Sequence, residues 1–448
     1  MDQRRGIGKA ECPNRCGIGS GPRHGPGYLD RPPEMIPVYY EDRHVGAISG
    51  SGAEIGFEYD PDWIAAKDAF PVSATMPLTG EEFPREFSTN WFANLLPEEV
   101  QLRAFARLNR SHPADLYTLL KKTGRETAGA LSIGGPEAAG KYLVRSEEEL
   151  ANDIDQLPAR PLLAGKEDVT LSLAGAQSKM VIARIDGQIH LPLNGAASTH
   201  ILKPETRLYA SVENEALCMR LAKAVGLDVA DVEVGKALQR PYLLVKRYDR
   251  VQEDSISVKR LHQEDAAQAL GYSPLQKYEA HGGPKISDLF RAIDRFSSNR
   301  VRDRLELRDR IIFNACIANT DAHAKNFSFL ITQDYKLAPA YDLLTAAPYD
   351  NITHNMAMKI GQQRNYRYID HKAWVAFADD CGLAPAATVR QVSHVANAIL
   401  EKIAAESDKL VAEGQAARTG TDYIRSEIVD QTNRILKNLD TNQSAGSA

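Results

Sequence analysis

Short stretches of apolar residues separated by turn signals predict strands in two parts of the chain. Residues 38–40 and 45–48 are apolar and flank the polar segment 41–44, which is typical of a hairpin. Residues 180–185 and 189–193 flank Asp186-Gly187, a dipeptide that favours a type I′ turn because both central positions need a positive φ. Apolar runs at 200–203 and 241–245 are expected to be two further strands.

A helical period replaces this pattern in most of the second half. Apolar residues at 217, 221, 224 and 225 share one helical face, and Gly226 is suited to end that helix because it lacks a Cβ. From about residue 260 to 435 the pattern is mainly helical, except for 327–331 and 335–337, which predict a small hairpin. Helices are also expected over about 90–110 and from about 113 to Gly124.

These patterns divide the chain into five parts. Residues 1–33 are rich in Gly, Pro and Arg and lack a hydrophobic period, so a disordered or non-native tail is expected there. A first α/β unit over 34–160 ends at a Pro-containing linker. We expect a β-rich lobe over 161–248, a mainly helical lobe over 249–435 and a flexible tail over 436–448.

Composition narrows the class of protein. A chain of 448 residues exceeds the roughly 250–300 that one core usually supports, so two or three domains are expected. The net charge of -5 argues against non-specific nucleic-acid binding by the whole chain. The five cysteines are few and mostly lie in apolar stretches, which is typical of a reducing compartment. No apolar run approaches the roughly 18 residues of a membrane span and no signal peptide is recognisable, so a cytoplasmic location without membrane contact is expected.

Polar residues between the predicted elements supply the groups that phosphoryl transfer needs: a phosphate cradle, a lysine, a carboxylate base and oxygen ligands for Mg²⁺. Gly175 lies in a turn between strands, where backbone N–H groups can approach phosphate. Lys203 ends a strand, and Glu215 on the next helix can hold its ammonium group. Asp321 and Asn326 have the D-x-x-x-x-N spacing of protein kinases. Asp342, past the small hairpin, is placed as a second magnesium ligand.

Each of these residues alone also has an ordinary structural interpretation. Asp321 can be a helix N-cap, Lys203 a solvated charge at a strand end, and Glu215 a surface residue paired along its helix. Gly175 can serve a turn or bulge, and Asp342 a turn. Their order along the chain and their places beside strands and helices favour the joint interpretation, a kinase-like site.

Other enzyme classes lose support because their motifs are missing from the sequence. There is no G-x-S-x-G, no H-E-x-x-H and no P-loop G-x-x-x-x-G-K-[ST]. His323, between Asp321 and Asn326, can orient the aspartate or a phosphate, or it can be a structural histidine; the structural role is favoured.

The chain resembles the HipA-type serine/threonine kinases from about residue 37 to 430. The matching segments are 94–97 (NLLP), 124–126 (GRE), 171–179 (LSLAGAQSK), 199–204 (THILKP), 212–215 (VENE), 260–265 (RLHQED), 277–279 (KYE), 319–328 (NTDAHAKNFS) and 337–342 (LAPAYD).

This resemblance implies an α+β, protein-kinase-like two-lobed fold, with a β-rich N-lobe, a largely helical C-lobe and an extra N-terminal α/β subdomain. It implies ATP and Mg²⁺ as cofactors, and the activity of a toxin of a type II toxin–antitoxin module. Such toxins phosphorylate a serine of an aminoacyl-tRNA synthetase, which inhibits translation and causes growth arrest and persistence. The implied partners are a HipB-type antitoxin, operator DNA through the antitoxin complex, and the synthetase substrate.

Carried over residue by residue, the resemblance makes Asp321 the catalytic base and Asn326 and Asp342 the Mg²⁺ ligands. Ser172 matches the serine that such kinases autophosphorylate, and a doubly charged phosphate there would repel nucleotide from the pocket. The segment 246–248 is expected to contact adenine, mainly through its backbone. The residues implied to bind ATP are Ala174, Gly175, Ala176, Gln177, Ser178, Lys179, Lys203, Lys246, Arg247, Tyr248, His323, Ala324, Lys325, Asn326, Tyr341 and Asp342.

One departure and two alternative functions remain open. Ser178 stands where the family's best-known member has an acidic residue, which makes Ser178 a second possible phosphosite. A small-molecule kinase would use the same ATP-binding residues, although the nearly complete N-terminal match favours a protein substrate. A kinase-like binding module or co-repressor in a DNA-bound antitoxin complex is the other alternative, against which the intact Lys203, Asp321, Asn326 and Asp342 argue.

Overall fold

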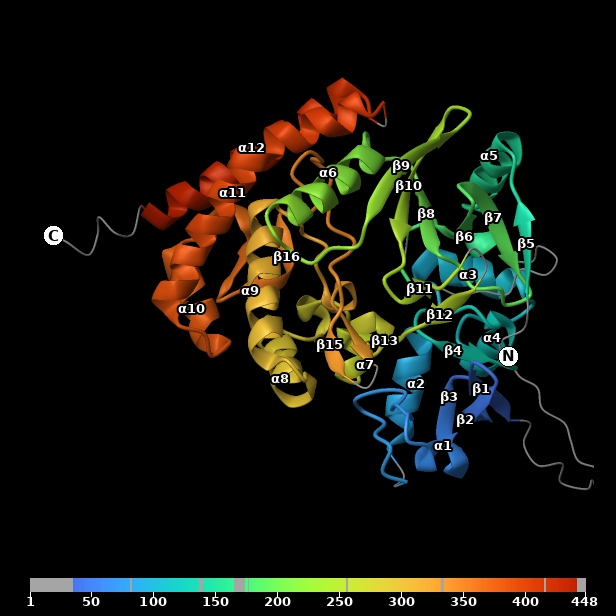
Figure 1. Cartoon of the computed structure of the whole chain (residues 1–448). Coiled ribbons are helices and arrows are strands. Elements are labelled where there is room, and N and C mark those ends of the chain that lie inside the picture. The colour runs from blue at the N-terminus through green and yellow to red at the C-terminus, as the bar shows by residue number, and fades with distance from the viewer. Residues whose placement is uncertain are drawn as a thin grey trace, which may run out of the picture. The chain divides into compact units, whose positions relative to one another are not determined.

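The computed structural model divides into two units, Met1–Glu34 and Met35–Ala448. The ranges that the structure describes all lie in the second unit: 35–80, 83–136, 140–164, 174–175, 177–254, 257–331, 334–414 and 416–440. The predicted tail 1–33 and the residues Ser172 and Ala176 lie outside these ranges. Within the second unit, long helices gather on one side and the larger sheets on the other (Figure 1).

The N-terminal subdomain is built on a four-stranded antiparallel sheet with the order β3-β2-β1-β4. Its core contains Val38, Ile48 and Phe57 from the strands, packed with Trp91 and Phe92. The predicted hairpin is confirmed, since β1 and β2 pair across residues 41–42. The elements are β1 (Ile36–Tyr40), β2 (Arg43–Ser51), β3 (Glu54–Tyr59), α1 (Pro61–Ala65), α2 (Arg85–Ala93), α3 (Glu99–Leu108), α4 (Leu116–Thr123) and β4 (Leu131–Ile133).

The helix predicted over 90–110 is wrong in its middle, because α2 ends at Ala93 and α3 begins at Glu99. Pro97 has no N–H to donate within a helix, and a proline also disfavours the helical conformation of the residue before it. The Glu98 N–H donates instead to the carbonyl oxygen of Gly175, at 3.3 Å. The break therefore places residues 94–98 against the predicted phosphate loop.

The N-lobe is a six-stranded sheet with the order β5-β7-β6-β8-β10-β9. The predicted turn between β6 and β7 is confirmed, since Asp186 and Gly187 have φ of 49° and 79°. Side chains of β10 alternate between two cores, because Leu243 and Val245 pack with α6 whereas Leu244 packs with α5. The elements are β5 (Lys141–Val144), α5 (Glu147–Gln156), η1 (Pro161–Leu163), β6 (Met180–Ile185), β7 (Gln188–Leu193), β8 (His200–Pro204), α6 (Ser211–Ala224), β9 (Val232–Ala237) and β10 (Arg240–Lys246).

The junction between the two sheets lies earlier than the predicted boundary at residue 160. β5 pairs with β7, and α5 packs on the six-stranded sheet, although both precede that boundary. We therefore place the junction between Ile133 and Lys141.

Two small sheets connect the lobes. β13 (His262–Asp265), β14 (Ser328–Ile331) and β15 (Tyr335–Leu337) form the first, so the predicted hairpin over 327–337 is confirmed and gains a third strand. A hairpin of β11 (Arg250–Gln252) and β12 (Val258–Arg260) leads into β13.

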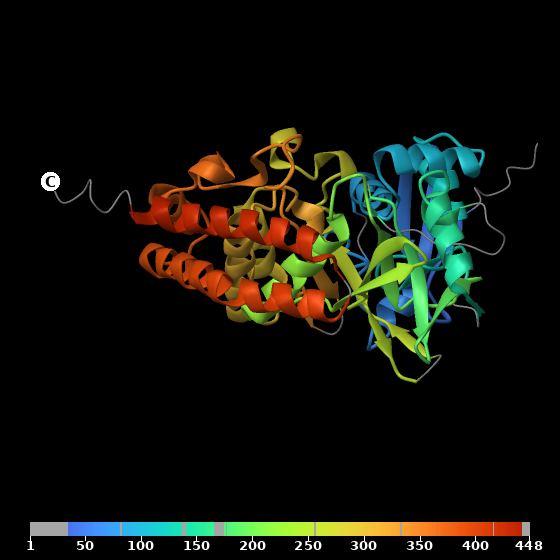
Figure 2. The same cartoon turned by 90° about the horizontal axis from the view of Figure 1, so that it is seen from above.

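The C-lobe is largely helical, as predicted, and α11 and α12 lie side by side along it (Figure 2). The predicted flexible tail begins too early, because residues 436–440 continue α12 and Leu439 is buried. The hairpin β16–β17 was not predicted. The elements are α7 (Ala266–Ala269), η2 (Pro274–Gln276), η3 (Glu279–His281), α8 (Ile286–Phe296), α9 (Arg300–Cys316), η4 (Ala324–Asn326), β16 (Asn355–Ile360), β17 (Gln363–Asn365), η5 (Tyr366–Tyr368), α10 (His371–Asp380), α11 (Pro385–Ala412) and α12 (Arg418–Asp440).

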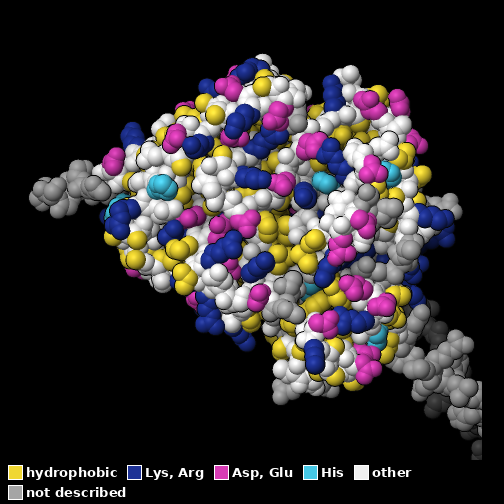
Figure 3. Space-filling model, in the orientation of Figure 1, with side chains coloured by type: hydrophobic (Ala, Val, Ile, Leu, Met, Phe, Trp, Pro, Cys, Tyr) yellow, Lys and Arg dark blue, Asp and Glu magenta, His cyan; other side chains and the backbone are white. Residues whose placement is uncertain are grey.

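Two surface properties bear on the predictions. Within the described ranges, no helix combines the length and the apolar character needed to cross a membrane. On the face shown in Figure 3, acidic and basic side chains are interspersed and do not separate into areas of one sign.

Candidate active site

A cavity of about 330 Å³ lies where the N-terminal subdomain, the N-lobe and the C-lobe meet. The subdomain contributes Asn94 and Glu98, and the N-lobe contributes Lys203 among others. The C-lobe contributes Asp321 and Asp342. Most of the residues predicted to act together, although spread over 168 positions from Ala174 to Asp342, thus line one cavity.

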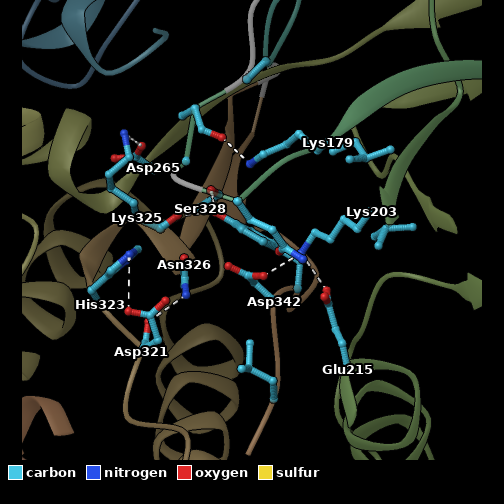
Figure 4. A pocket seen from close by; sticks show the side chains of 18 of the residues that line it. Lys179, Lys203, Glu215, Asp265, Asp321, His323, Lys325, Asn326, Ser328 and Asp342 are labelled. Carbon is cyan, nitrogen blue, oxygen red and sulfur yellow. Dashed lines mark hydrogen bonds and ion pairs between the residues drawn. The ribbon is translucent and has the colours of Figure 1, made fainter. Parts of the chain in front are cut away.

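Lys203 occupies the centre of a three-residue ion cluster in this cavity. Its Nζ lies 2.7 Å from Glu215 Oε1 and 2.5 Å from Asp342 Oδ1 (Figure 4). The interpretation of Lys203 and Glu215 as surface residues is wrong, since they are 8% and 4% exposed. Burial opposes the charge of Lys203, but Asp342 and Glu215 together hold its pKa above its usual range. The lysine is therefore a fixed cation that can meet a phosphate.

Asp342 has a backbone conformation that non-glycine residues seldom adopt, with φ of 58°. Burial disfavours its charged form, yet the neighbouring Lys203 lowers the pKa of this carboxyl to about 2. Strained backbone of this kind concentrates at functional sites, where it fixes the direction of a side chain. The carboxylate is thus held ionised at physiological pH, facing the cavity.

The segment from Asp321 to Asn326 forms a tight loop rather than a helix start. The Asp321 N–H donates to Asn319 Oδ1 at 3.2 Å, and Asn326 Nδ2 donates to the carbonyl oxygen of Asp321 at 2.9 Å. Asp321 is not an N-cap, because the following 3-10 turn η4 begins after His323. Its side chain is 50% exposed, and Oδ1 accepts a hydrogen bond from the Tyr278 hydroxyl at 2.6 Å.

His323 lines the cavity and also packs against neighbouring side chains. It is buried, and its Nε2 lies 4.0 Å from Asp321 Oδ1. Burial lowers the pKa of this imidazole, so the ring is neutral near pH 7. The ring packs edge-on against Tyr278, with centroids 5.1 Å apart.

Lys179 connects the two ends of the described part of the phosphate loop through a hydrogen bond. Its Nζ donates to the carbonyl oxygen of Ala174 at 2.5 Å, and a Cβ on Gly175 would lie 2.5 Å from the same Nζ. Glycine is favoured at 175 because its φ is 110°, a conformation that residues with a Cβ rarely adopt. Burial and the nearby Lys203 lower the pKa of Lys179 to about 8. Gln177 also lines the cavity, whereas Ser178 accepts a hydrogen bond from Gln101 Nε2 at 3.2 Å and is not part of the lining.

The segment 246–248 lines the cavity, but its contacts restrict how it can meet a base. The N–H of Lys246 donates to the Asp231 carbonyl oxygen and the N–H of Arg247 to that of Thr199, so neither is free for adenine. The guanidinium of Arg247 points away into an ion cluster with Glu126. Tyr248 and Tyr341 both line the cavity, with ring centroids 5.8 Å apart and ring planes inclined by 32°.

Two of the predicted ATP-binding residues, Lys325 and Ala324, make contacts within the protein. The ammonium of Lys325 bonds to Asn94 Oδ1 at 2.6 Å and also pairs with Glu98 and Asp265, at 3.5 and 3.3 Å. Ala324 is buried outside the cavity lining, and its N–H donates to the carbonyl oxygen of Lys277. These contacts hold the loop in place, and Lys325 also lines the cavity.

Two residues of the cavity are suited to bind a magnesium ion whose other ligands come mainly from the nucleotide. A carboxylate oxygen of Asp342 and the amide oxygen of Asn326 are ligand types that Mg²⁺ takes, and both residues line the same cavity. Asn326 Nδ2 is bonded to Asp321, which leaves the amide oxygen as the ligand atom. The described residues form no cluster of three or more His, Cys, Asp or Glu side chains that could hold a metal alone.

Sequence reasoning missed four residues of this site: Asn94, Glu98, Lys277 and Tyr278. Glu98 lies 2.5 Å from the Lys277 ammonium, and Tyr278 bonds Asp321. Asn94, Lys277 and Tyr278 lie in NLLP and KYE, two of the segments that carry the family resemblance. The sequence alone did not indicate what these three residues do.

Comparisons with known proteins agree with these features over most of the chain. A family model described as the HipA N-terminal domain matches residues 36–134, and one described as the HipA-like C-terminal domain matches 171–406. The putative kinase Y4mE of Sinorhizobium fredii is 40% identical over 382 residues, which cover 83% of this chain and 91% of that protein. The serine/threonine-protein kinase toxin HipA of Shewanella oneidensis is 28% identical over 389 residues, covering 82% and 88%.

A solved structure extends the likeness to three dimensions. A chain of the toxin–antitoxin complex of HipA, HipB and operator DNA from Shewanella oneidensis MR-1 matches with a TM-score of 0.79 at 25% identity. The match covers 91% of this chain and 99% of that one. The kinase-like two-lobed α+β fold with an added N-terminal subdomain is thereby confirmed, and the chain belongs to the HipA family of serine/threonine-protein kinase toxins.

Proposed function

We propose that the chain transfers the γ-phosphate of ATP to a serine hydroxyl of a protein. The observation that carries the proposal is the convergence of Lys203, Asp321, Asn326 and Asp342 on one cavity, with Lys203 buried between two carboxylates. Phosphoryl transfer depends mainly on positioning and on charge stabilisation, which this arrangement provides.

Each side chain has a distinct part in the proposed reaction. Asp321 accepts the proton of the serine hydroxyl as the oxygen attacks the γ-phosphorus and the bond to the leaving ADP oxygen breaks. Lys203, kept in place by Glu215, bonds a phosphate oxygen of the nucleotide. Mg²⁺, when bound by Asn326 and Asp342, neutralises the charge that develops on the phosphate oxygens.

The protein partners are proposed by similarity. The related Shewanella chain is in a complex with HipB and operator DNA, and this chain covers 99% of it. We therefore propose a HipB-type antitoxin as partner, and operator DNA bound through that complex. An aminoacyl-tRNA synthetase is the proposed substrate, and its loss of activity is the proposed cause of growth arrest.

Ser172, outside the described residues, is proposed as an autophosphorylation site. In the sequence it comes shortly before Ala174, which lines the cavity, and a phosphate there would add about two negative charges to this segment. Replacing Ser172 with Ala should keep the enzyme active for longer in ATP, and unchanged inactivation kinetics would argue against this role.

The substrate proposal is tested with γ-labelled ATP and a panel of purified aminoacyl-tRNA synthetases. Label on a serine of one synthetase, lost with Lys203→Met and kept with the exposed-site control Asp350→Asn, is the expected result. Transfer to a small metabolite and to none of the synthetases would contradict it.

A further inference from the structure

Tyr278 makes the closest contact of the Asp321 carboxylate. Its hydroxyl donates to Asp321 Oδ1 at 2.6 Å, the length of a charge-assisted hydrogen bond. Burial and the negative charge of Asp321 raise the pKa of Tyr278 well above its usual range. The phenol therefore stays protonated and remains a donor throughout the physiological pH range.

The ring of Tyr278 is held by contacts on several sides. His323 and His281 pack against it edge-on, with centroids 5.1 and 5.5 Å away. The Lys277 ammonium lies 5.3 Å from the ring centroid, within the range of a cation–π interaction. The carbonyl oxygen of Lys277 also accepts the Ala324 N–H, which ties this segment to the loop that carries Asp321.

Lys277 is in turn anchored by the N-terminal subdomain. Glu98 Oε2 lies 2.5 Å from the Lys277 ammonium, and both side chains are buried. Burial opposes the charge of Glu98, but Lys325 and Lys277 lower the pKa of its carboxyl. A continuous series of contacts thus runs from Glu98 through Lys277 and Tyr278 to Asp321.

A half-exposed carboxylate can rotate unless a neighbour fixes it, and a base works only when one oxygen faces the attacking hydroxyl. With Oδ1 occupied by Tyr278, Oδ2 is left to accept the substrate proton. We infer that Tyr278 is a positioning residue for Asp321, and that the N-terminal subdomain keeps it in place through Glu98 and Lys277. This inference rests on the proposed kinase activity.

The same geometry has a second chemical interpretation. The Tyr278 hydroxyl lies where a serine hydroxyl would also have to approach the base, so it could compete with the substrate. The two interpretations predict opposite effects on rate, because removing a competitor speeds transfer whereas removing a positioning group slows it.

The test measures γ-phosphate transfer, to the chain itself and to the synthetase panel, by the wild-type chain and by Tyr278→Phe. The isosteric change removes only the hydroxyl, so we expect the rate at saturating MgATP to fall about tenfold, the worth of one charge-assisted hydrogen bond. The dissociation constant for MgATP, measured by calorimetry, is expected to stay within about twofold, because the hydroxyl bonds the base and not the nucleotide. Tyr368→Phe, at a side chain that is 66% exposed, is the matched control and keeps the wild-type rate.

Glu98→Gln changes the other end of the series of contacts that leads to Asp321, and it leaves Tyr278 and Asp321 themselves unchanged. We expect a fall of about threefold in the transfer rate, because a neutral amide holds the Lys277 ammonium less firmly. An unchanged rate in Glu98→Gln overturns the part assigned to the subdomain.

The remaining outcomes separate this inference from the function on which it rests. An active wild-type chain with an equally active or faster Tyr278→Phe variant overturns the positioning role and leaves the proposed function standing. A wild-type chain that transfers no phosphate overturns both.

Discussion

Two clusters of charged side chains lie near β10, one beside its C-terminal end and one beside its neighbouring strand β8, and they differ in what their charges can still bind. The arginine cluster, made of Arg247, Arg250, Arg260, Glu126 and Asp249, is buried throughout. Glu126 alone lies within 3.0 Å of all three guanidinium groups. All four residues of the nucleotide cluster, Lys179, Lys203, Glu215 and Asp342, line the cavity, whereas only Arg247 and Asp249 of the arginine cluster do so.

The difference shows how similar residue types serve structure in one place and chemistry in another. The arginine cluster joins the N-terminal subdomain to β11, β12 and the residue after β10, and each guanidinium group donates to a backbone carbonyl oxygen. In the nucleotide cluster, Lys203 shares its ammonium with Asp342, a residue that a metal ion can also use. Changes in the first cluster should therefore affect folding, and changes in the second should affect activity.

Among changes in the two clusters, Asp342→Asn has the largest expected effect and sharpens this distinction. Phosphate transfer should fall by about 10³-fold, because a neutral amide would replace the carboxylate that we propose binds Mg²⁺. Asparagine tolerates the left-handed backbone, and Lys203 retains Glu215, so the fold should persist. Initial-rate assays with labelled ATP check the first expectation and urea unfolding the second. Wild-type activity in this variant would remove Asp342 from the site.

Glu126→Gln should produce the opposite pattern. Three buried guanidinium groups would lose the charge that they share, which costs about 3–5 kcal/mol in the free energy of unfolding. Below the unfolding transition, MgATP binding should remain close to that of the wild type. A decrease of less than about 1 kcal/mol in the free energy of unfolding would contradict this comparison, since the arginine cluster would then contribute little to stability.

Lys179 should give the smallest effect, a dependence of nucleotide binding on pH. Its pKa near 8 in the free protein lies below the ordinary value for lysine, so the ammonium is lost as pH rises through 8. A bound phosphate favours the charged form, so binding near pH 8 should take up a proton, and affinity should weaken by up to about tenfold per pH unit above it. Calorimetry in buffers of different ionisation enthalpy measures the uptake. Lys179→Arg, charged at every pH used, should abolish it, and a pH-independent wild type would contradict the assignment.

Local patterns in the sequence predicted the elements that are stabilised by near neighbours. The hairpin at Asp186-Gly187, the strand that ends at Lys203 and the helix closed by Gly226 follow from alternation, period and turn chemistry. The ion pair of Lys203 with Glu215 followed from spacing, since the two residues lie on consecutive elements.

Features decided by distant partners could not be predicted in this way. The side chain of Arg247 turns away from the cavity because Glu126, 121 positions earlier, attracts it. β13 exists as a strand because it pairs with β14, and no local signal marks that partner. Pro97 in the sequence is a sufficient indication of the break between α2 and α3. The consequence of the break, the contact of Glu98 with Lys277, is visible only in the structure.

The central claim is that Asp321 is the base of a phosphoryl-transfer site built by the described residues. The most direct test compares wild type and Asp321→Asn in two measurements, MgATP binding by calorimetry and transfer of labelled γ-phosphate. The variant is expected to bind MgATP within about threefold of the wild type and to transfer phosphate about 10²–10⁴-fold more slowly, the usual contribution of a general base. Transfer by Asp321→Asn at the wild-type rate would contradict the account.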